Sequence, residues 1–203
     1  MRNPVMTTDD VGLQPLVARS YLALADVLDP LSDDRWDTPS LCAGWRVREV
    51  VAHLTMAARY SERAFLAELR ACDFDFSRLS DLIAGRDARL PTAELVANLR
   101  REVMHRWTPP DGGHRGALSH VVIHGLDITV PLGVPRLAAD EAMVVVLDSL
   151  GAEGGARHFG VDLAGRRLEA TDLDWSFGAG QPLRGPAEDL VLLLAGRSPM
   201  ADS

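Results

Sequence analysis

The sequence has few cysteines, few aromatic side chains and no hydrophobic segment long enough to suggest a membrane span. Only Cys42 and Cys72 occur among its 203 residues. Two cysteines cannot build the disulfide framework of a small secreted protein, so we expect a cytoplasmic location with reduced thiols. The first ten residues contain no apolar core, and we therefore expect no signal peptide.

Long apolar runs and a surplus of positive charge are also missing. The longest apolar stretches, residues 142–147 and 190–195, fall well short of the roughly 20 residues that cross a bilayer. The formal net charge is −8, from 29 acidic and 21 basic side chains. A nucleic-acid-binding protein normally presents a basic face. We therefore expect neither a membrane nor a nucleic acid as partner.

The first two thirds of the chain shows the apolar periodicity of amphipathic helices. We expect irregular joins at residues 31–44 and 72–91. The helices that they connect are predicted at about residues 9–28, 46–70, 91–107 and 115–130. Four such helices predict a four-helix bundle, a fold that builds metal sites from side chains projecting inward from facing helices.

The pattern changes after Pro131. A fifth helix is predicted at 137–150 and a closing helix at 186–195. Between them, segments 158–163 and 167–177 have strand character, and the second alternates apolar and polar residues. The predicted fold is therefore mainly α, with a helical bundle at residues 1–135 and a small α+β domain at residues 136–203.

Three histidines are the most informative residues of the chain. His120 and His124 are four apart in a helical run, so they share one helix face about 6 Å apart along the axis. His53 lies in another helical run, and a third imidazole from a facing helix would complete a three-nitrogen metal site with open positions. His105 and His114 are expected at the surface.

The type of ligand limits the metal. Neutral imidazoles suit zinc, nickel or iron(II), and each needs a hydrogen-bond partner on its other ring nitrogen. Glu49, four residues before His53, and Asp127, three after His124, could serve, although each also fits a solvated helix charge. A metal-free bundle with histidines in its core is the alternative.

Three other features favour simple structural roles. Cys42 could be a nucleophile, but the sequence places no base beside it, and a small buried residue is the simpler interpretation. The glycine-rich segment 151–155 follows a helix instead of a strand, so we interpret it as a helix end and not as a phosphate loop. The carboxylates of 72–87 lack the spacing of a calcium loop and predict a solvated loop.

Several segments resemble one family. Residues 41–54, LCAGWRVREVVAHL, resemble the signature of the DinB-like, mycothiol-dependent maleylpyruvate isomerase family. Residues 120–128, HVVIHGLDI, continue the resemblance. Residues 168–175 and 184–197 resemble the small C-terminal domain of that family, so the resemblance covers nearly the whole chain.

The resemblance implies a DinB-type bundle with a divalent metal, often zinc, and the actinobacterial thiol mycothiol as cosubstrate. His53 and His124 match two of the family's metal ligands. His120 stands where the isomerase carries a glutamate, and three histidines are the pattern of thiol-transferase relatives. This departure argues against maleylpyruvate isomerisation itself. The isomerase also uses a basic residue of its C-terminal domain, which Arg184 or Arg197 would supply as a substrate or thiol contact.

Two functional hypotheses follow. In the first, the protein is a metal-dependent enzyme, with zinc preferred over nickel or iron, in which mycothiol attacks a small electrophile by S-transfer or thiol-assisted isomerisation. In the second, it is a non-catalytic metal-binding stress or binding module, whose site is closed by a fourth protein ligand. We expect a monomer or a homodimer.

Overall fold

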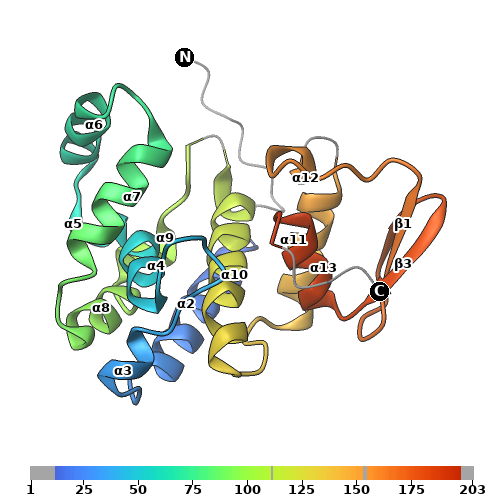
Figure 1. Ribbon diagram of the computed structural model, residues 1–203, viewed down its shortest axis with the longest axis horizontal. Helices are drawn as coiled ribbons and strands as arrows, with labels where there is room; N and C mark the ends of the chain where they lie inside the picture. The colour runs from blue at the N-terminus through green and yellow to red at the C-terminus, as the bar shows by residue number, and fades with distance from the viewer. Residues whose placement is uncertain (1–11, 111, 153–154, 198–203) are drawn as a thin grey trace. The chain divides into compact units, whose positions relative to one another are not determined.

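The computed structural model describes residues 12–110, 112–152 and 155–197 (Figure 1). The chain divides into two compact units, Met1–Pro135 and Arg136–Ser203. The first unit is helical and the second combines helices with a small sheet, which confirms the predicted fold class. Within the described residues, no helix is both long and apolar enough to cross a membrane.

Four helices form the body of the first unit. Helix α10 (Gly113–Leu132) packs against α2 (Gln14–Leu28) and α4 (Val47–Leu54), and α7 (Phe76–Asp87) packs against α4 (Figure 1). Each turns a run of apolar side chains inward. The fully buried ones include Tyr21, Leu24, Leu28, Val50, Val51, Leu54, Leu79, Ile83, Leu118 and Ile128.

The prediction of a single helix at 46–70 is wrong, because the helix is interrupted twice in this segment. After α4 come the short α5 (Met56–Arg59) and then α6 (Glu62–Ala71). Arg59 supports the first break, since its guanidinium donates to the carbonyl oxygens of Ala52 and Thr55 at the end of α4.

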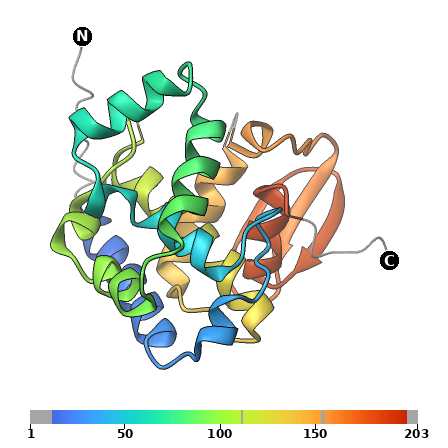
Figure 2. The ribbon, with the colours of Figure 1, turned by 60° about the vertical axis from the view of Figure 1, so that its left-hand side comes forward.

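The prediction of an irregular segment at 72–91 is also wrong, because this segment contains α7. Asp75 caps this helix by accepting from the backbone N–H of Arg78 at 3.0 Å. Asp73 and Phe74 adopt left-handed backbone conformations, with φ of 56° and 62°, and turn the chain at the corner between α6 and α7 that Figure 2 shows. The carboxylates of this segment therefore include a helix cap.

Smaller differences concern the joins of the first unit. The helix expected at 91–107 is divided into α8 (Thr92–Leu99) and α9 (Glu102–Arg106). The loop expected at 31–44 contains the short α3 (Asp33–Trp36), whose Trp36 is buried in the core.

The second unit is a three-stranded sheet with helices. Its strands, in the order β2-β1-β3, are β1 (Arg166–Ala170), β2 (Ser176–Gly178) and β3 (Gln181–Gly185). Its helices are α11 (Asp140–Gly151), α12 (Gly155–His158) and α13 (Ala187–Leu194). β1 pairs antiparallel with β2 and parallel with β3.

The strand predictions for this unit were partly wrong. The strand predicted at 158–163 is wrong, because no residue of that segment lies in a strand. Segment 167–177 contributes to two strands, and β3 was not predicted. Gly180 makes the turn into β3 possible. It has a φ of 120°, and a Cβ there would lie 2.2 Å from the carbonyl oxygen of Gly165.

Candidate metal centre

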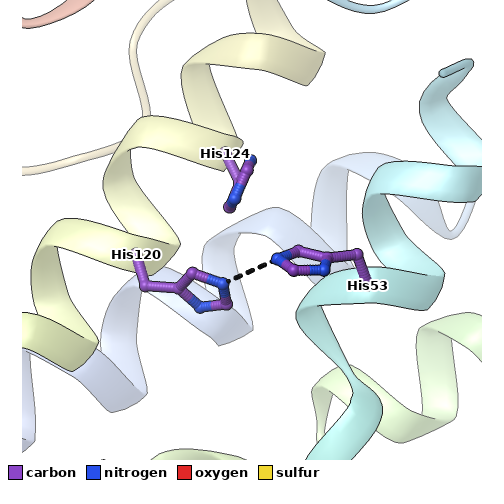
Figure 3. A group of neighbouring side chains, drawn as sticks. All are labelled: His53, His120 and His124. Atoms are coloured by element: carbon purple, nitrogen blue, oxygen red, sulfur yellow. Dashed lines mark hydrogen bonds between the residues drawn. The ribbon is translucent and has the colours of Figure 1, made fainter. Parts of the chain in front are cut away.

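Two packed helices bring three imidazoles together. His53 lies near the end of α4, and His120 and His124 lie one turn apart in the middle of α10. The ring centroids are 5.1 Å apart for His53 and His120, and 4.9 Å apart for each of the other two pairs. Figure 3 shows the three rings turned toward one another.

The distances between nitrogen atoms suit a single ion. Nε2 of His53 and Nε2 of His120 are 3.0 Å apart, as the dashed line in Figure 3 marks, and one nitrogen from each ring lies within 4.8 Å of the others. A zinc–nitrogen bond is about 2.0–2.1 Å long, so two nitrogens on one ion lie about 3.0–3.4 Å apart. The nitrogens of His53 and His120 therefore have the spacing of two ligands on one divalent metal, and His124 lies close enough to offer a third.

Polar side chains hold the outer nitrogens of two of these rings. The hydroxyl oxygen of Ser80, on α7, lies 2.8 Å from Nδ1 of His53. A carboxylate oxygen of the fully buried Asp127 lies 2.9 Å from Nδ1 of His124. When both Nδ1 atoms carry the proton, each Nε2 presents a lone pair to the centre, which is the form that binds metal.

The outer nitrogen of His120 differs from the other two. Its Nδ1 is buried and has no hydrogen-bond partner among the described residues. Leaving such a buried polar group without a partner costs free energy. The expectation that each imidazole has a partner on its outer nitrogen is therefore not met at His120.

The surroundings keep two of the imidazoles uncharged. Burial lowers the pKa of His53 to about 3, with a further lowering from His124 and an opposing effect from Asp127. Burial, together with the neighbouring histidines, also holds the pKa of His120 well below its ordinary value. Both rings are therefore neutral at pH 7, and no proton has to leave them before a metal binds.

Cys42 lies beside the outer nitrogen of His124. Its thiol donates to a carboxylate oxygen of Asp127 at 3.0 Å, and its sulfur is 3.6 Å from Nδ1 of His124. The backbone N–H of Leu41 also donates to the carbonyl oxygen of Asp127 at 3.0 Å. The loop is thus tied to α10, and Cys42 is a part-buried member of a second donor group with His124 and Asp127.

Ser80 and the contact of Cys42 were not predicted from the sequence. Two carboxylates were considered as imidazole partners. Asp127 contacts the outer nitrogen of His124, whereas Glu49 pairs with Arg46 at 2.5 Å. Neither is a solvated helix charge, because both are buried.

The remaining predicted residues lie elsewhere. His114 is buried, so its predicted surface position was wrong, and His105 is half-buried with its ring nitrogen 3.2 Å from the carbonyl oxygen of Leu99. Arg184 and Arg197 both belong to the second unit. There the Nε of Arg184 donates to Glu169 at 2.6 Å, and Arg197 donates to a backbone carbonyl oxygen of its own segment.

The fold and this group of side chains define a helical-bundle protein with a candidate three-histidine metal centre. Residues 17–108 match the family described as "Mycothiol maleylpyruvate isomerase N-terminal domain".

Solved structures extend the likeness to the whole fold. The structure of the mycothiol-dependent maleylpyruvate isomerase is 16% identical, with a TM-score of 0.55, over 95% of this chain and 93% of that one. A point mutant of that isomerase is 15% identical with the same TM-score and coverage. At these identities the likeness shows the fold. Among curated proteins, none matches the sequence significantly.

Proposed function

We propose that this protein is a divalent-metal-dependent enzyme that uses mycothiol to attack a small electrophile. The observation that carries the proposal is the convergence of three imidazoles, two of them held neutral by burial, on two facing helices. The family of the N-terminal region supports the thiol, since mycothiol is in its description.

His53, His120 and His124 would hold the ion through one nitrogen each. When bound, a divalent metal supplies the positive charge that keeps a thiol in its thiolate form near neutral pH. The residues around it fix the geometry, because Ser80 and Asp127 orient two of the rings through their outer nitrogens.

The number of ligands favours an enzyme over a non-catalytic module. A structural zinc site is closed by four protein ligands, whereas a catalytic site keeps a position free. The described residues group only three donors at this centre. Cys42 belongs to a separate donor group with Asp127 and the outer nitrogen of His124. Three protein ligands would leave a coordination position of the ion for a substrate.

The proposed reaction is nucleophilic attack by sulfur. The sulfur lone pair forms a bond to an electrophilic carbon, and in S-transfer the leaving group departs with the electron pair of its bond. In thiol-assisted isomerisation, addition converts a double bond into a rotatable single bond, and elimination of the thiol restores the double bond. Arg184 or Arg197 would contact the substrate or the thiol.

Thiol binding and metal dependence test this function together. The thermal midpoint of the metal-loaded protein should rise with mycothiol concentration, because a ligand that binds only the folded state stabilises it. His53→Ala should abolish both metal binding and any thiol consumption with an electrophile. A midpoint that mycothiol does not move, together with thiol consumption equal in this variant, would contradict the proposal.

A further inference from the structure

Three aromatic side chains border the histidines, and we call them the aromatic rim: Trp45, Phe76 and Trp107. The ring of Trp45 is 5.1 Å from that of His53, and Phe76 is 6.5 Å from the same histidine. The ring of Trp107 is 5.3 Å from His120. The three come from a loop, from the start of α7 and from the residue that follows α9, so tertiary packing and not local sequence assembles them.

The rim is open to solvent while the histidine beneath it is not. Phe76 is 50% exposed and Trp45 and Trp107 are half-buried, whereas His53 is 5% exposed. Covering the exposed ring of Phe76 with a ligand would remove apolar surface from water, which favours binding. Aromatic side chains beside convergent polar groups are typical of the lining of a small-molecule site.

The rim is also held in place. The indole N–H of Trp45 donates to Asp81 of α7 at 3.0 Å, which joins the loop to the helix that carries Phe76. Phe65 of α6 lies 6.4 Å from Phe76, ring to ring. A surface fixed before binding loses little conformational entropy when a ligand arrives.

The described contacts of the three histidines include no cationic side chain, so a bound ion would supply the positive charge at the centre. Among the described contacts of the three histidines, Asp127 is the one charged side chain, and it is negative. Two arginines close to His53 in the sequence are engaged elsewhere: Arg46 pairs with Glu49, and Arg59 pairs with Asp87 at 2.9 Å. In the metal-free protein, a carboxylate would therefore find no cationic partner among these contacts.

We propose that the aromatic rim selects an uncharged, flat, conjugated electrophile, such as an aryl enone, by stacking on its ring. This inference rests on the proposed function only for the chemistry that follows binding. In that step the thiol sulfur forms a bond to the β-carbon, the double-bond electrons move to the carbonyl as an enolate, and the enolate carbon takes a proton from solvent. Binding itself needs neither metal nor thiol.

Equilibrium dialysis of the full-length protein tests the binding step. The probes are benzylideneacetone, a neutral aryl enone, and cinnamate, which replaces its acetyl group with a carboxylate. Both are measured with and without a chelator, so that attachment of a carboxylate to a metal is recognised. We expect benzylideneacetone to bind at least about tenfold more tightly than cinnamate in chelator.

Two alanine variants on α7 assign the effect to the rim. Phe76→Ala should weaken benzylideneacetone binding about tenfold, since a stacked aromatic pair and its buried area are lost. Leu82→Ala removes a 45% exposed apolar side chain from the same helix and should leave binding unchanged. In turnover with thiol, Phe76→Ala should raise the KM for the enone and not for the thiol.

The outcomes separate this inference from the proposed function. Equal effects of the two variants, tighter binding of cinnamate in chelator, or a raised KM for the thiol alone would overturn the rim as an electrophile site. Dialysis that shows a Phe76-dependent enone site in a protein without metal or thiol activity would support the rim and sink the proposed function instead.

Discussion

Ser80→Ala is the substitution whose effect follows most directly from the geometry. It removes one hydroxyl, which lies 2.8 Å from Nδ1 of His53 and is the polar group that fixes the orientation of that ring. Ser80 is 6% exposed, so water replaces the lost hydrogen bond poorly. Leaving a buried donor without a partner costs about 1–3 kcal/mol, and loss of such an outer contact typically lowers metal affinity about 10–100-fold.

The assay is competition between the protein and a chromogenic chelator for zinc at pH 7.5. Ser20→Ala is the matched control, because the hydroxyl of Ser20 donates only to the carbonyl oxygen of Leu16 in its own helix, at 2.9 Å. We expect a loss of about 10–100-fold for Ser80→Ala and none for Ser20→Ala. Wild-type affinity in Ser80→Ala, or equal losses in both, would refute the reasoning.

Three further predictions concern the centre and its support. Asp127→Asn should lower zinc affinity about 10–100-fold in the same chelator assay, whereas Cys42→Ala should cost less, because its thiol is weakly placed on His124, at 3.6 Å, and acts mainly through Asp127; equal losses would contradict this order. The free energy of urea unfolding of the metal-free protein should fall as the pH falls from 6.5 toward 3, by about 1.4 kcal/mol per pH unit for one histidine. The reason is that His53 is protonated in the unfolded chain over this range, whereas the folded ring, with a pKa of about 3, stays neutral. A slope unchanged by His53→Gln would count against this prediction. Arg59→Met should destabilise by about 1–3 kcal/mol in urea unfolding, because the buried carboxylate of Asp87 loses one of its two arginine partners and keeps Arg86 and Tyr60; an unchanged midpoint would exclude that role.

The pair on α10 could be predicted because its information is local. His120 and His124 share a helix face by spacing alone, and the predicted helix at 115–130 agrees closely with α10. The approach of His53 could be expected from the pattern of a bundle, since helices α4 and α10 each turn an apolar face inward.

Helix α7 was missed because its aspartates obscured the apolar spacing of Leu79, Ile83 and Ala84. Asp75 is in fact the cap that starts the helix, and a cap followed by such spacing was the available signal. Because α7 was not predicted, the contact between Ser80 and His53 could not be predicted either. This contact depends on the packing of α7 against α4, which local sequence spacing does not encode.

The contact of Cys42 was missed for a different reason. It depends on the loop before α4 lying against α10, 85 residues further along the chain, where Leu41 bonds to the backbone of Asp127. No local motif encodes such a long-range contact. The aromatic rim has the same origin, because its three members come from segments that only the tertiary fold brings together.

Metal analysis of the purified protein tests the central claim most directly. The wild-type chain should carry about one equivalent of a divalent transition metal, as a single three-imidazole site would hold. His53→Ala and His124→Ala should each lose it, while His105→Ala, which changes a histidine outside the group, should keep it. Full occupancy in both His53→Ala and His124→Ala would show that these histidines do not form the metal centre.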